Sequence, residues 1–450
     1  MLSRIQFGLT AAFHYLYPPL SIGLGVVLVL LEGLWLRTGN PVWHDAARYW
    51  TKVFALTFAI GVATGLVMEF EFGTNWAAYS RFVGDVFGSA LAAEGVFAFF
   101  LESGFLAVLL FGWDRVPRWL HYLSTCMVCG GAHFSAVWIV VANSWMHTPA
   151  GYHVVQGPNG MRAEITDFWA MVFNPSSMER LSHVIGGAWI AGAAVVLSVS
   201  AWWLLRRRHE AVAKASLSVA LAVALVACTW QAVTGHWSAE GVAKNQPAKF
   251  AAMEGHFKTG PADLVVLGHP DAASQTTSAV IAIPGGASWL LTGDAKASVP
   301  GLDAYKPEDR PPVAPVFWSY RLMLGTALLM MAVVFVAAIQ WTRGALWTSR
   351  FTLGLLVPAV LLPQIANQAG WFAAEVGRQP WIVQDLMRTK DAVSRTVSAS
   401  EVWISLGMFT VIYIALFILF IYLLNEKVQH GPDQGDSAHG PLLRLGRAGA

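Results

Sequence analysis

Nine apolar stretches, each long enough to cross a lipid bilayer, dominate this chain of 450 residues. They lie at about 9–36, 53–76, 89–112, 120–145, 181–205, 215–235, 316–341, 351–371 and 401–424. A helix needs about 20 mainly apolar residues to span the hydrocarbon core. Inside that core every backbone N–H and C=O must be paired within its own segment, so we expect each stretch to be helical. The sequence therefore predicts an all-α integral membrane protein with about nine transmembrane helices.

The composition agrees with this fold class. The chain is 56% hydrophobic and only 12% charged, with a mean hydropathy of +0.51, whereas soluble domains carry roughly a quarter charged residues. The 21 tryptophans gather near the ends of the apolar stretches, as an interfacial aromatic belt would. A net charge of +2 gives no indication of a nucleic-acid partner, and three cysteines provide no disulfide framework. The first stretch lacks a small-residue cleavage site, so we expect a retained helix rather than a signal peptide.

Basic residues predict the orientation, because Lys and Arg concentrate in the short cytoplasmic loops. With the N-terminus outside, the inner loops hold Arg37, Arg48, Lys52, Arg115, Arg118, Arg206, Arg207, Arg208, Lys214, Arg343 and Arg350. Except for the segment after helix eight, the short outer segments are poorer in basic residues. We therefore divide the chain into helices one to six (1–235), an outer loop (236–313), helices seven to nine (314–426) and an inner polar tail (427–450).

The polar residues within the apolar stretches are the candidates for function. They include His14, Glu94, Glu102, His183, Arg321, Met323 and Glu375. Ionisable groups are expensive in lipid and usually mark a functional pathway. Histidine and methionine also serve as axial ligands of haem iron. The alternatives are a satisfied core histidine and a methionine that only fills a packing gap.

The residue types suggest two kinds of iron site. A His/Met pair closes both axial positions and suits electron transfer, and His183 and Met323 are the candidates. A single protein ligand leaves one axial position free for oxygen, as His14 or Glu375 would. Glu375 also stands three residues before Arg378, where helical neighbours meet in an ion pair. That structural alternative is compatible with haem, since an arginine can also serve a propionate.

Glu94 and Glu102 form a second polar pattern. They are eight residues apart, so they fall within about 80° of each other on one helical face. Two carboxylates on one buried face resemble a proton relay. The alternative is a helix that faces a polar partner subunit.

The cysteines and remaining histidines of the fourth stretch give a weaker signal. Cys126 and Cys129 form a CxxC motif within an apolar helix, where packing of small residues is the favoured interpretation. His121, His133 and His147 do not form the close cluster that a copper site requires, which argues against a haem-copper oxidase.

Long motifs resemble those of subunit I of the cytochrome bd quinol oxidases. They are SRIQFGLTAAFHYLYPPLSIG, GVATGLVMEFEFGTNW, EGVFAFFLES, SAVWIVVAN and GWFAAEVGRQPW, and the resemblance covers most of the chain. It implies that His14 and Glu375 each ligate a high-spin haem. It also implies that His183 and Met323 ligate a low-spin haem b, with Arg321 beside them.

The same resemblance assigns the remaining intramembrane residues. Glu94 matches a glutamate at the oxygen-reducing haem, Glu102 one in a proton path, and Ser135 the family's serine in SAVWIVVAN. Trp371 matches a tryptophan packed among the haems, and Arg378 lies within the same final motif. The chain departs from the family pattern at Glu71 and Gln368, where glutamine and glutamate are expected.

The outer segment after helix six resembles the family's quinol loop, in the short form that includes the cyanide-insensitive oxidases. Quinol oxidation needs a group that takes the hydroxyl proton and a donor or cation that holds the ring oxygen. The run NQPAKFAAMEGHF supplies Lys249 and Glu254, which match the family's quinol-binding positions. Without the resemblance, such a pair on a loop is usually a solvated face.

The resemblance implies a haem-bearing subunit that oxidises quinol (ubiquinol or menaquinol) outside and reduces oxygen with protons from inside, without pumping. Its cofactors would be low-spin haem b, high-spin haem b, and haem d or a second high-spin haem b. Its partners would be subunit II, a small single-helix accessory subunit and the lipid of a bacterial cytoplasmic membrane, with no nucleic acid. The alternatives are a haem scaffold that reduces no oxygen and a proton-coupled transporter. The chain lacks the internal repeat that many transporters show.

Overall fold

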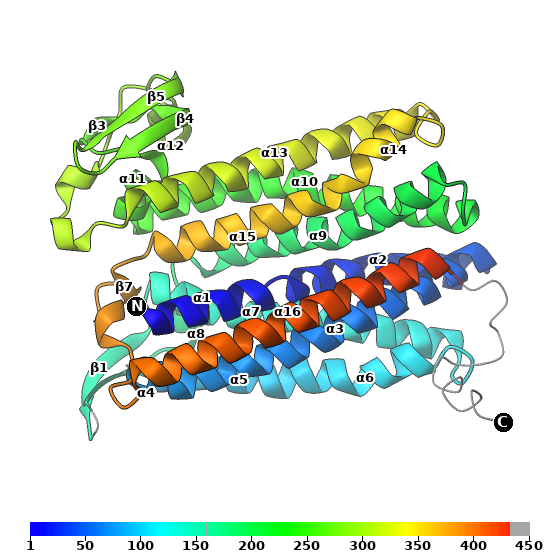
Figure 1. The fold of residues 1–450 in the computed structure, drawn as a ribbon, viewed down its shortest axis with the longest axis horizontal. Helices are drawn as coiled ribbons and strands as arrows, with labels where there is room; N and C mark the ends of the chain where they lie inside the picture. The colour runs from blue at the N-terminus through cyan, green and yellow to red at the C-terminus, as the bar shows by residue number, and fades with distance from the viewer. Residues whose placement is uncertain (159, 433–450) are drawn as a thin grey trace.

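The computed structural model describes residues 1–158 and 160–432 (Figure 1). Within these residues nine helical segments are long and apolar enough to cross a membrane. They are Leu2–Thr38, Pro41–Thr74, Gly84–Phe111, Arg118–His147, Ser177–Leu205, Glu210–Asn245, Pro307–Thr342, Arg350–Val376 and Ala399–His430. Figure 1 shows them lying side by side along one direction. The predicted number of transmembrane helices is therefore confirmed for the described part of the chain.

The described residues form sixteen α-helices, of which α4, α8, α11 and α12 lie outside the nine spans. The helices are α1 (Leu2–His14), α2 (Tyr17–Thr38), α3 (Pro41–Thr74), α4 (Ala77–Phe82), α5 (Gly84–Ala93), α6 (Phe100–Phe111), α7 (Arg118–His147), α8 (Phe168–Val172), α9 (Ser177–Leu205), α10 (Glu210–Asn245), α11 (Pro247–Glu254), α12 (Gly286–Thr292), α13 (Val313–Thr342), α14 (Arg350–Leu356), α15 (Leu361–Val376) and α16 (Ala399–His430).

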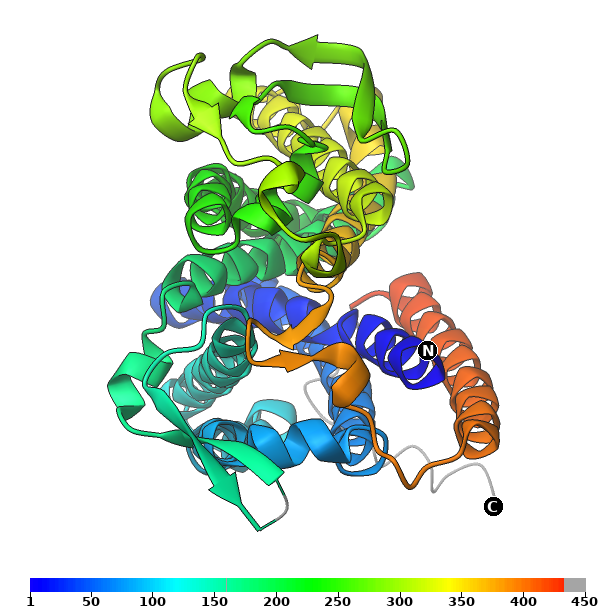
Figure 2. The same cartoon turned by 90° about the vertical axis from the view of Figure 1, so that its left-hand side faces the viewer.

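Short antiparallel hairpins connect several helices at the end of the bundle that carries the N-terminus (Figure 2). The strands are β1 (Tyr152–Gly157), β2 (Gly160–Ile165), β3 (Gly260–Pro261), β4 (Leu264–Asp271), β5 (Thr276–Ile283), β6 (Ser298–Val299), β7 (Trp381–Val383) and β8 (Met387–Arg388). They pair as β1 with β2, β3 with β6, β4 with β5 and β7 with β8. The predicted all-α class thus holds for the membrane part, while these connections contain small sheets.

Three of the spans are interrupted at places where the backbone geometry changes. The first breaks between α1 and α2, just before Pro18 and Pro19, which occupy the first turn of α2 where a missing N–H costs nothing. The third contains a π-helix at Glu94–Phe99 between α5 and α6, a form that often marks functional sites. The eighth is broken by a 3₁₀ turn at Pro358–Val360 between α14 and α15.

Several helices extend beyond the ends expected from hydropathy. The sixth continues from Gly235 to Asn245, so the first part of the predicted 236–313 loop is helical. The eighth continues to Val376 and the ninth to His430, which takes in the start of the predicted inner tail. The rest of that tail, at 433–450, lies outside the described residues. Hydropathy detects the hydrocarbon core alone, whereas helices continue with polar residues past its edge.

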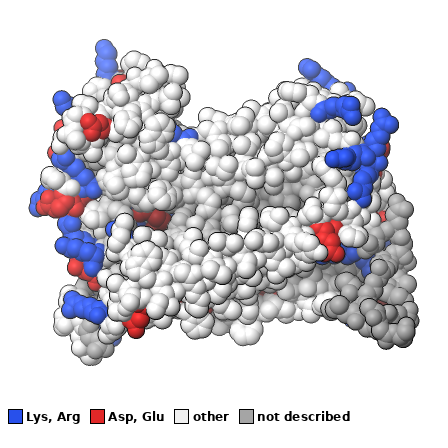
Figure 3. Space-filling model, viewed as in Figure 1, with Lys and Arg blue, Asp and Glu red and all other residues white. Residues whose placement is uncertain are grey.

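Charged side chains gather at the two ends of the bundle and leave an uncharged band between them on the face drawn in Figure 3. This distribution is that of a protein crossing a bilayer, because charges within lipid are expensive. We call the end with the N-terminus and the hairpins the N-terminal end, and the other the opposite end (Figure 1).

The main hydrophobic core lies where α2, α3, α9 and α10 meet. A Cβ added to Gly23 would lie 2.3 Å from the carbonyl oxygen of Ala188, and one on Gly192 would lie 2.3 Å from the backbone of Gly23. Helices α2 and α9 thus touch backbone to backbone, as small residues allow in membranes. Trp50 is fully buried and donates from Nε1 to Ser216 Oγ at 2.9 Å. This packing fixes the helices that carry the polar residues of the N-terminal end.

Candidate functional site

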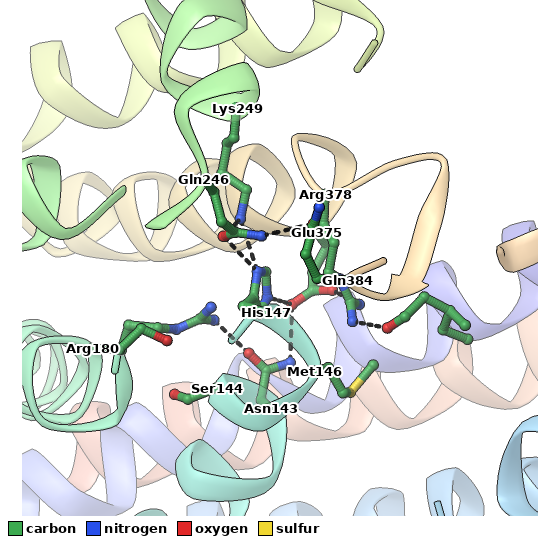
Figure 4. Close-up of polar contacts among 12 residues, drawn as sticks. Asn143, Ser144, Met146, His147, Arg180, Gln246, Lys249, Glu375, Arg378 and Gln384 are labelled. Carbon is green, nitrogen blue, oxygen red and sulfur yellow. Dashed lines mark hydrogen bonds and ion pairs between the residues drawn. The ribbon is translucent and has the colours of Figure 1, made fainter. Parts of the chain in front are cut away.

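A cluster of polar side chains surrounds Glu375 in the last turn of α15 (Figure 4). Its Oε1 accepts a hydrogen bond from Asn143 Nδ2 at 2.9 Å and lies 3.3 Å from His147 Nε2. Its Oε2 pairs with the guanidinium of Arg378, so the ion pair expected from their spacing forms. Arg180 in turn donates to Asn143 Oδ1. The carboxylate is therefore held from α7, α9 and the turn that follows α15.

Lys249 on α11 joins this cluster from the outer loop of the sequence prediction. Its Nζ lies 2.8 Å from His147 Nδ1 and donates to Gln246 Oε1 at 2.6 Å. His147 therefore stands between Lys249 and Glu375, with one ring nitrogen toward each (Figure 4). Lys249 is only 3% exposed, so it does not belong to a solvated face.

The surroundings of Lys249 weaken its affinity for a proton. Burial holds its pKa well below the usual range for lysine, and the positive charges of Arg180 and Arg378 act in the same direction. The carboxylate of Glu375 opposes them. A lysine in such a position exchanges a proton more readily than one in water.

Sequence reasoning missed Asn143, His147, Arg180 and Gln246 as members of this cluster. Asn143 and His147 are four residues apart in the last turns of α7, so they share one face of the helix. That spacing was the available signal for these two. Nothing in the sequence indicated that this face meets α11 and α15.

Glu254, at the end of the same short helix α11, points to different partners. Arg321 Nη2 on α13 donates to Glu254 Oε2 at 2.7 Å, and Nη1 donates to Met253 O at 3.0 Å. The Nε of Arg321 donates to Val265 O in β4 at 2.6 Å. Glu254 is 3% exposed, and burial raises its pKa while Arg321 opposes the shift. The structure thus places both Lys249 and Glu254 in buried sites without joining their side chains.

His14 ends α1 and lies against α3. Its Nδ1 is 3.0 Å from Thr64 Oγ1. A Cβ on Gly65 would come within 3.2 Å of the imidazole Cε1, so the glycine makes room for the ring. The break after His14 therefore places this side chain between two helices in the half of the bundle that carries the N-terminus.

The two departures from the family pattern also lie beside α1. Glu71 on α3 accepts a hydrogen bond from Thr10 Oγ1 at 2.6 Å, one α1 turn before His14. Gln368 on α15 donates to Ala12 O at 2.8 Å. Both side chains therefore help to position the segment that ends at His14.

His183 lies in the second turn of α9 and faces α10. Both of its ring nitrogens are 3.1 Å from Gln231 Nε2. A Cβ on Gly235 would lie 3.6 Å from His183 Cε1, and one on Gly186 would lie 2.3 Å from Gln231 Oε1. Glycines on two helices thus leave space around this histidine.

Met323 on α13 faces a glycine of the neighbouring helix α15. A Cβ on Gly370 would lie 2.7 Å from the Met323 sulfur. A Cβ on Gly187 of α9 would lie 2.8 Å from Asn367 Oδ1 of α15. Trp371 follows Gly370 and is partly buried. Helices α9, α13 and α15 therefore approach one another through glycines where Met323 projects.

Glu94 and Glu102 both meet α7, although the segment between them is not a regular α-helix. Ser135 Oγ donates to Glu94 Oε1 at 2.8 Å. A Cβ on Gly131, one turn before Ser135, would lie 3.0 Å from Glu102 Cβ. Glu94 begins the π-helix, and Glu102 is buried in the first turn of α6. The structure thus brings Glu94 to Ser135 and places Glu102 one turn of α7 away.

Comparison with known proteins places this geometry in one family. The family model described as cytochrome bd terminal oxidase subunit I matches residues 2–432. The chain belongs to this family. Among its relatives, subunit 1 of the cytochrome bd ubiquinol oxidase of Bacillus subtilis is 37% identical over 450 residues, covering 98% of this chain and 95% of the relative. Subunit 1 of the cytochrome bd-II ubiquinol oxidase of Escherichia coli is 35% identical, covering 96% of each chain.

A solved structure agrees with the cytochrome bd assignment. The bd oxidase from Geobacillus thermodenitrificans superimposes with a TM-score of 0.88 at 30% identity, covering 96% of this chain and 98% of that one. The predicted enzyme class, a quinol:oxygen oxidoreductase, is thereby confirmed, together with its place among the terminal oxidases of respiratory chains. Neither proton-coupled transport nor electron transfer without oxygen reduction is the activity of this family.

The cytochrome bd family binds haem, and the side chains of His183 and Met323 fit such a group, because imidazole and thioether both serve as axial ligands of haem iron. Glycines on α9 and α15 let the side chains of Gln231, Asn367 and Met323 approach the helix backbones, where an added Cβ would lie 2.3 to 2.8 Å from them. Among the described residues, Gln231 Oε1, both amide atoms of Gln364 and Asn367 Nδ2 are buried without a hydrogen-bond partner. Buried polar atoms are normally hydrogen-bonded. Unpartnered ones are therefore expected where a bound group completes the interior of the protein.

Proposed function

We propose that this cytochrome bd subunit oxidises quinol at its N-terminal end and reduces oxygen beside His14, Glu94 and Glu375. The observation that carries the proposal is the continuous contact from Lys249 through His147 to Glu375. It joins a residue of the predicted quinol loop to a predicted haem ligand. The basic loops at the opposite end support an orientation with the N-terminal end outside, in the cytoplasmic membrane of a bacterium.

His183 and Met323 would hold a low-spin haem b, while His14 and Glu375 would each hold a high-spin haem, of type b or d. When bound, these groups supply electron transfer and oxygen reduction. Arg378, which pairs with Glu375, offers positive charge for a propionate. Trp371, next to Gly370 on α15, would pack among the haems.

Glu254 and Lys249 would serve the quinol. A carboxylate takes the proton of a quinol hydroxyl only when it is ionised, and Arg321 at 2.7 Å stabilises that ionised form of Glu254. Lys249 would hold the ring oxygen, and its lowered pKa lets it release a proton to His147 or recover one. Relatives named as ubiquinol and menaquinol oxidases support either quinol as the substrate.

Protons for oxygen reduction would enter from the opposite end, which we take as the cytoplasmic side. Glu102, buried beside α7, would pass them toward Glu94 and Ser135. Because quinol protons leave on one side and oxygen takes protons from the other, a potential forms without a pump. Subunit II and a small single-helix accessory subunit would complete the enzyme in the lipid, with no role for nucleic acid.

Replacing Lys249 with alanine tests the quinol assignment. Loss of a hydrogen bond to a charged group is worth about 1.5–3 kcal/mol, so we expect quinol-driven oxygen uptake to fall roughly 10- to 100-fold. The reduced-minus-oxidised haem spectrum should change little, since Lys249 reaches Glu375 only through His147 and is not itself a predicted haem ligand. Lys258→Ala is the matched control, because Lys258 is exposed on the same loop. Parental turnover by Lys249→Ala would refute the assignment.

A further inference from the structure

The β4–β5 hairpin of the loop between α10 and α13 carries apolar side chains on its outward face. In an antiparallel hairpin with one face against the protein, the other face is normally polar because it meets water. Here the exposed side chains of the two strands include Val266, Leu267, Val280, Ile281 and Ile283, with Val280 75% exposed, and register shifts between Val265 and Gly268 interrupt the usual alternation of faces. This part of the hairpin therefore lacks the polar side chains that normally face water.

The same character continues past the hairpin into α12. No Asp, Glu, Lys or Arg occurs between Ala272 and Gly293. Trp289 and Leu290 of α12 are exposed as well. The charged residue of the hairpin, Asp271, lies at its turn, where it caps Ala273 and Ser274. Carboxylate charge is thus confined to the tip, next to the exposed polar pair His269 and Ser278, and the exposed surface farther from the tip is mainly apolar.

Hydrogen bonds fix the depth of this surface along the bundle. Arg321 on α13 donates to the carbonyl of Val265 in β4 at 2.6 Å, so β4 lies level with Arg321. Arg321 lies in the first half of a candidate membrane span, Pro307–Thr342. The hairpin is also tied to α11, since Thr277 Oγ1 donates to Gly255 O at 2.7 Å. The strand β4 therefore lies beside this candidate span rather than standing above the bundle.

The figures show the same placement. In Figure 1 the hairpin projects sideways beyond the tilted α13. In Figure 3 the outline of the molecule is notched between this projection and the rising part of the bundle, and mainly uncharged atoms border the notch. The neighbouring surface of α13 is apolar and exposed at Trp318, Leu322, Leu328 and Leu329, as lipid-facing helices are.

We propose that the outward face of the β4–β5 hairpin and α12 is embedded in the lipid leaflet at the N-terminal end. Lipid, continuous with that around α13, covers its apolar side chains. The hairpin thereby holds open a lipid-filled entrance beside Arg321 and Glu254. This entrance role rests on the proposed quinol function, whereas the lipid contact does not.

Spin labelling tests the lipid contact. Val280→Cys and Lys296→Cys, each labelled with a nitroxide in the complete oxidase in lipid nanodiscs, are compared for relaxation by oxygen and by a water-soluble nickel complex. The labelled parent gives the background of Cys126, Cys129 and Cys228. We expect the label at 280 to respond to oxygen and not to nickel, and the label at 296, on the exposed α12–β6 connection, to do the reverse.

Two results would overturn the proposal. Equal nickel access at both positions would show that the hairpin stands in water. Shielding of position 280 from oxygen and nickel alike would show that a protein partner covers it. Neither the oxygen nor the nickel relaxation requires turnover of the enzyme. The lipid contact can therefore be refuted while the quinol function stands, and the quinol function can be refuted while the lipid contact stands.

A substrate comparison tests the entrance. Val280→Glu places a charge on the lipid face and should slow oxygen uptake with a long-chain, lipid-dissolved quinol several-fold more than with a short-chain, water-soluble one. Lys296→Glu is the control and should affect neither. The haem spectrum reports whether Val280→Glu has folded. Equal rates relative to the parent with both quinols would refute the entrance role.

Discussion

Met323 owes its position to the absence of a side chain at Gly370, whose Cβ would come within 2.7 Å of the sulfur. Leucine has a similar volume, so Met323→Leu should cost less than about 1.5 kcal/mol of stability. It removes the thioether, however, and methionine ligation raises the potential of a haem. We expect the six-coordinate low-spin spectrum to be lost or its reduction potential to fall, as measured by difference spectra and redox titration.

Met330→Leu provides the control for this substitution. Met330 is buried on the same helix, two turns away, and is not a predicted ligand. It should keep the parental spectrum and potential. A parental spectrum in Met323→Leu itself would remove Met323 from the ligand set.

Glu254 predicts a specific pH dependence of quinol oxidation. Burial raises its pKa, so the ionised base is lost as the pH falls through that raised value, and turnover declines on the acid side. Arg321 opposes the shift, hence Arg321→Gln should move the acid limb of kcat/KM to higher pH. Glu254→Gln should abolish the limb and most of the activity. The profiles are measured by quinol-driven oxygen uptake.

Glu308→Gln serves as the control for the pH profiles, because Glu308 is an exposed carboxylate of the same loop. Its acid limb should match that of the parent. If Arg321→Gln also reproduced the parental limb, Glu254 would not be the titrating base.

At the scale of helices, a buried hydrogen-bonded pair of side chains joins α2, α6 and α7 toward the opposite end. Glu32 Oε1 lies 2.6 Å from His121 Nδ1, and Thr125 donates to its Oε2. His121 Nε2 is 3.2 Å from Leu109 O. Both members of the pair are 1% exposed. His121, which the sequence did not place in a metal cluster, thus connects three helices.

Removing one partner of this pair should destabilise the bundle. Glu32→Leu leaves His121 Nδ1 buried without its hydrogen-bond partner, which costs about 1–3 kcal/mol. We expect a lower unfolding temperature, measured by loss of the haem spectrum on heating. The double variant Glu32→Leu/His121→Leu should recover part of the loss, since neither side chain of the pair then leaves a buried polar group unpaired.

An exposed pair supplies the comparison for this element. Lys214 and Glu210 are 3.4 Å apart, and both are exposed. Glu210→Ala should change stability by about 0.5 kcal/mol or less. An unfolding temperature in Glu32→Leu equal to that in Glu210→Ala would contradict the connector role.

At the scale of the whole molecule, the proposed function depends on taking protons from one side of the membrane. Glu102 is buried one α7 turn from Ser135, on the way from the opposite end to Glu94. Glu102→Ala should slow turnover because proton delivery to the oxygen site is impaired. Carbon monoxide should still bind the reduced enzyme. The measurements are oxygen uptake and membrane potential in liposomes, together with the carbon monoxide difference spectrum.

Glu426→Gln, an exposed change near the opposite end of α16, is the control for Glu102 and should leave both measurements at parental values. Should Glu102→Ala also turn over at the parental rate and generate the same potential, the proton role would pass to another residue.

The membrane helices could be predicted from the chain because their cause is local. Lipid offers no hydrogen bonds, so each apolar stretch must pair its own backbone groups, and a helix is the form that does so. The interruptions were harder to foresee. Hydropathy gave no sign of the π-helix at Glu94–Phe99, and the break after His14 lay within one continuous apolar run.

The neighbours of each candidate residue could not be predicted in the same way. The motifs identified Glu375 and Lys249, but the chain gave no reason to place His147 between them. Likewise, Lys249 and Glu254 share one short helix yet serve different clusters, because α11 packs between α7, α13 and α15. These contacts join residues more than sixty positions apart. They arise from the packing of whole helices, which no local pattern of residues encodes.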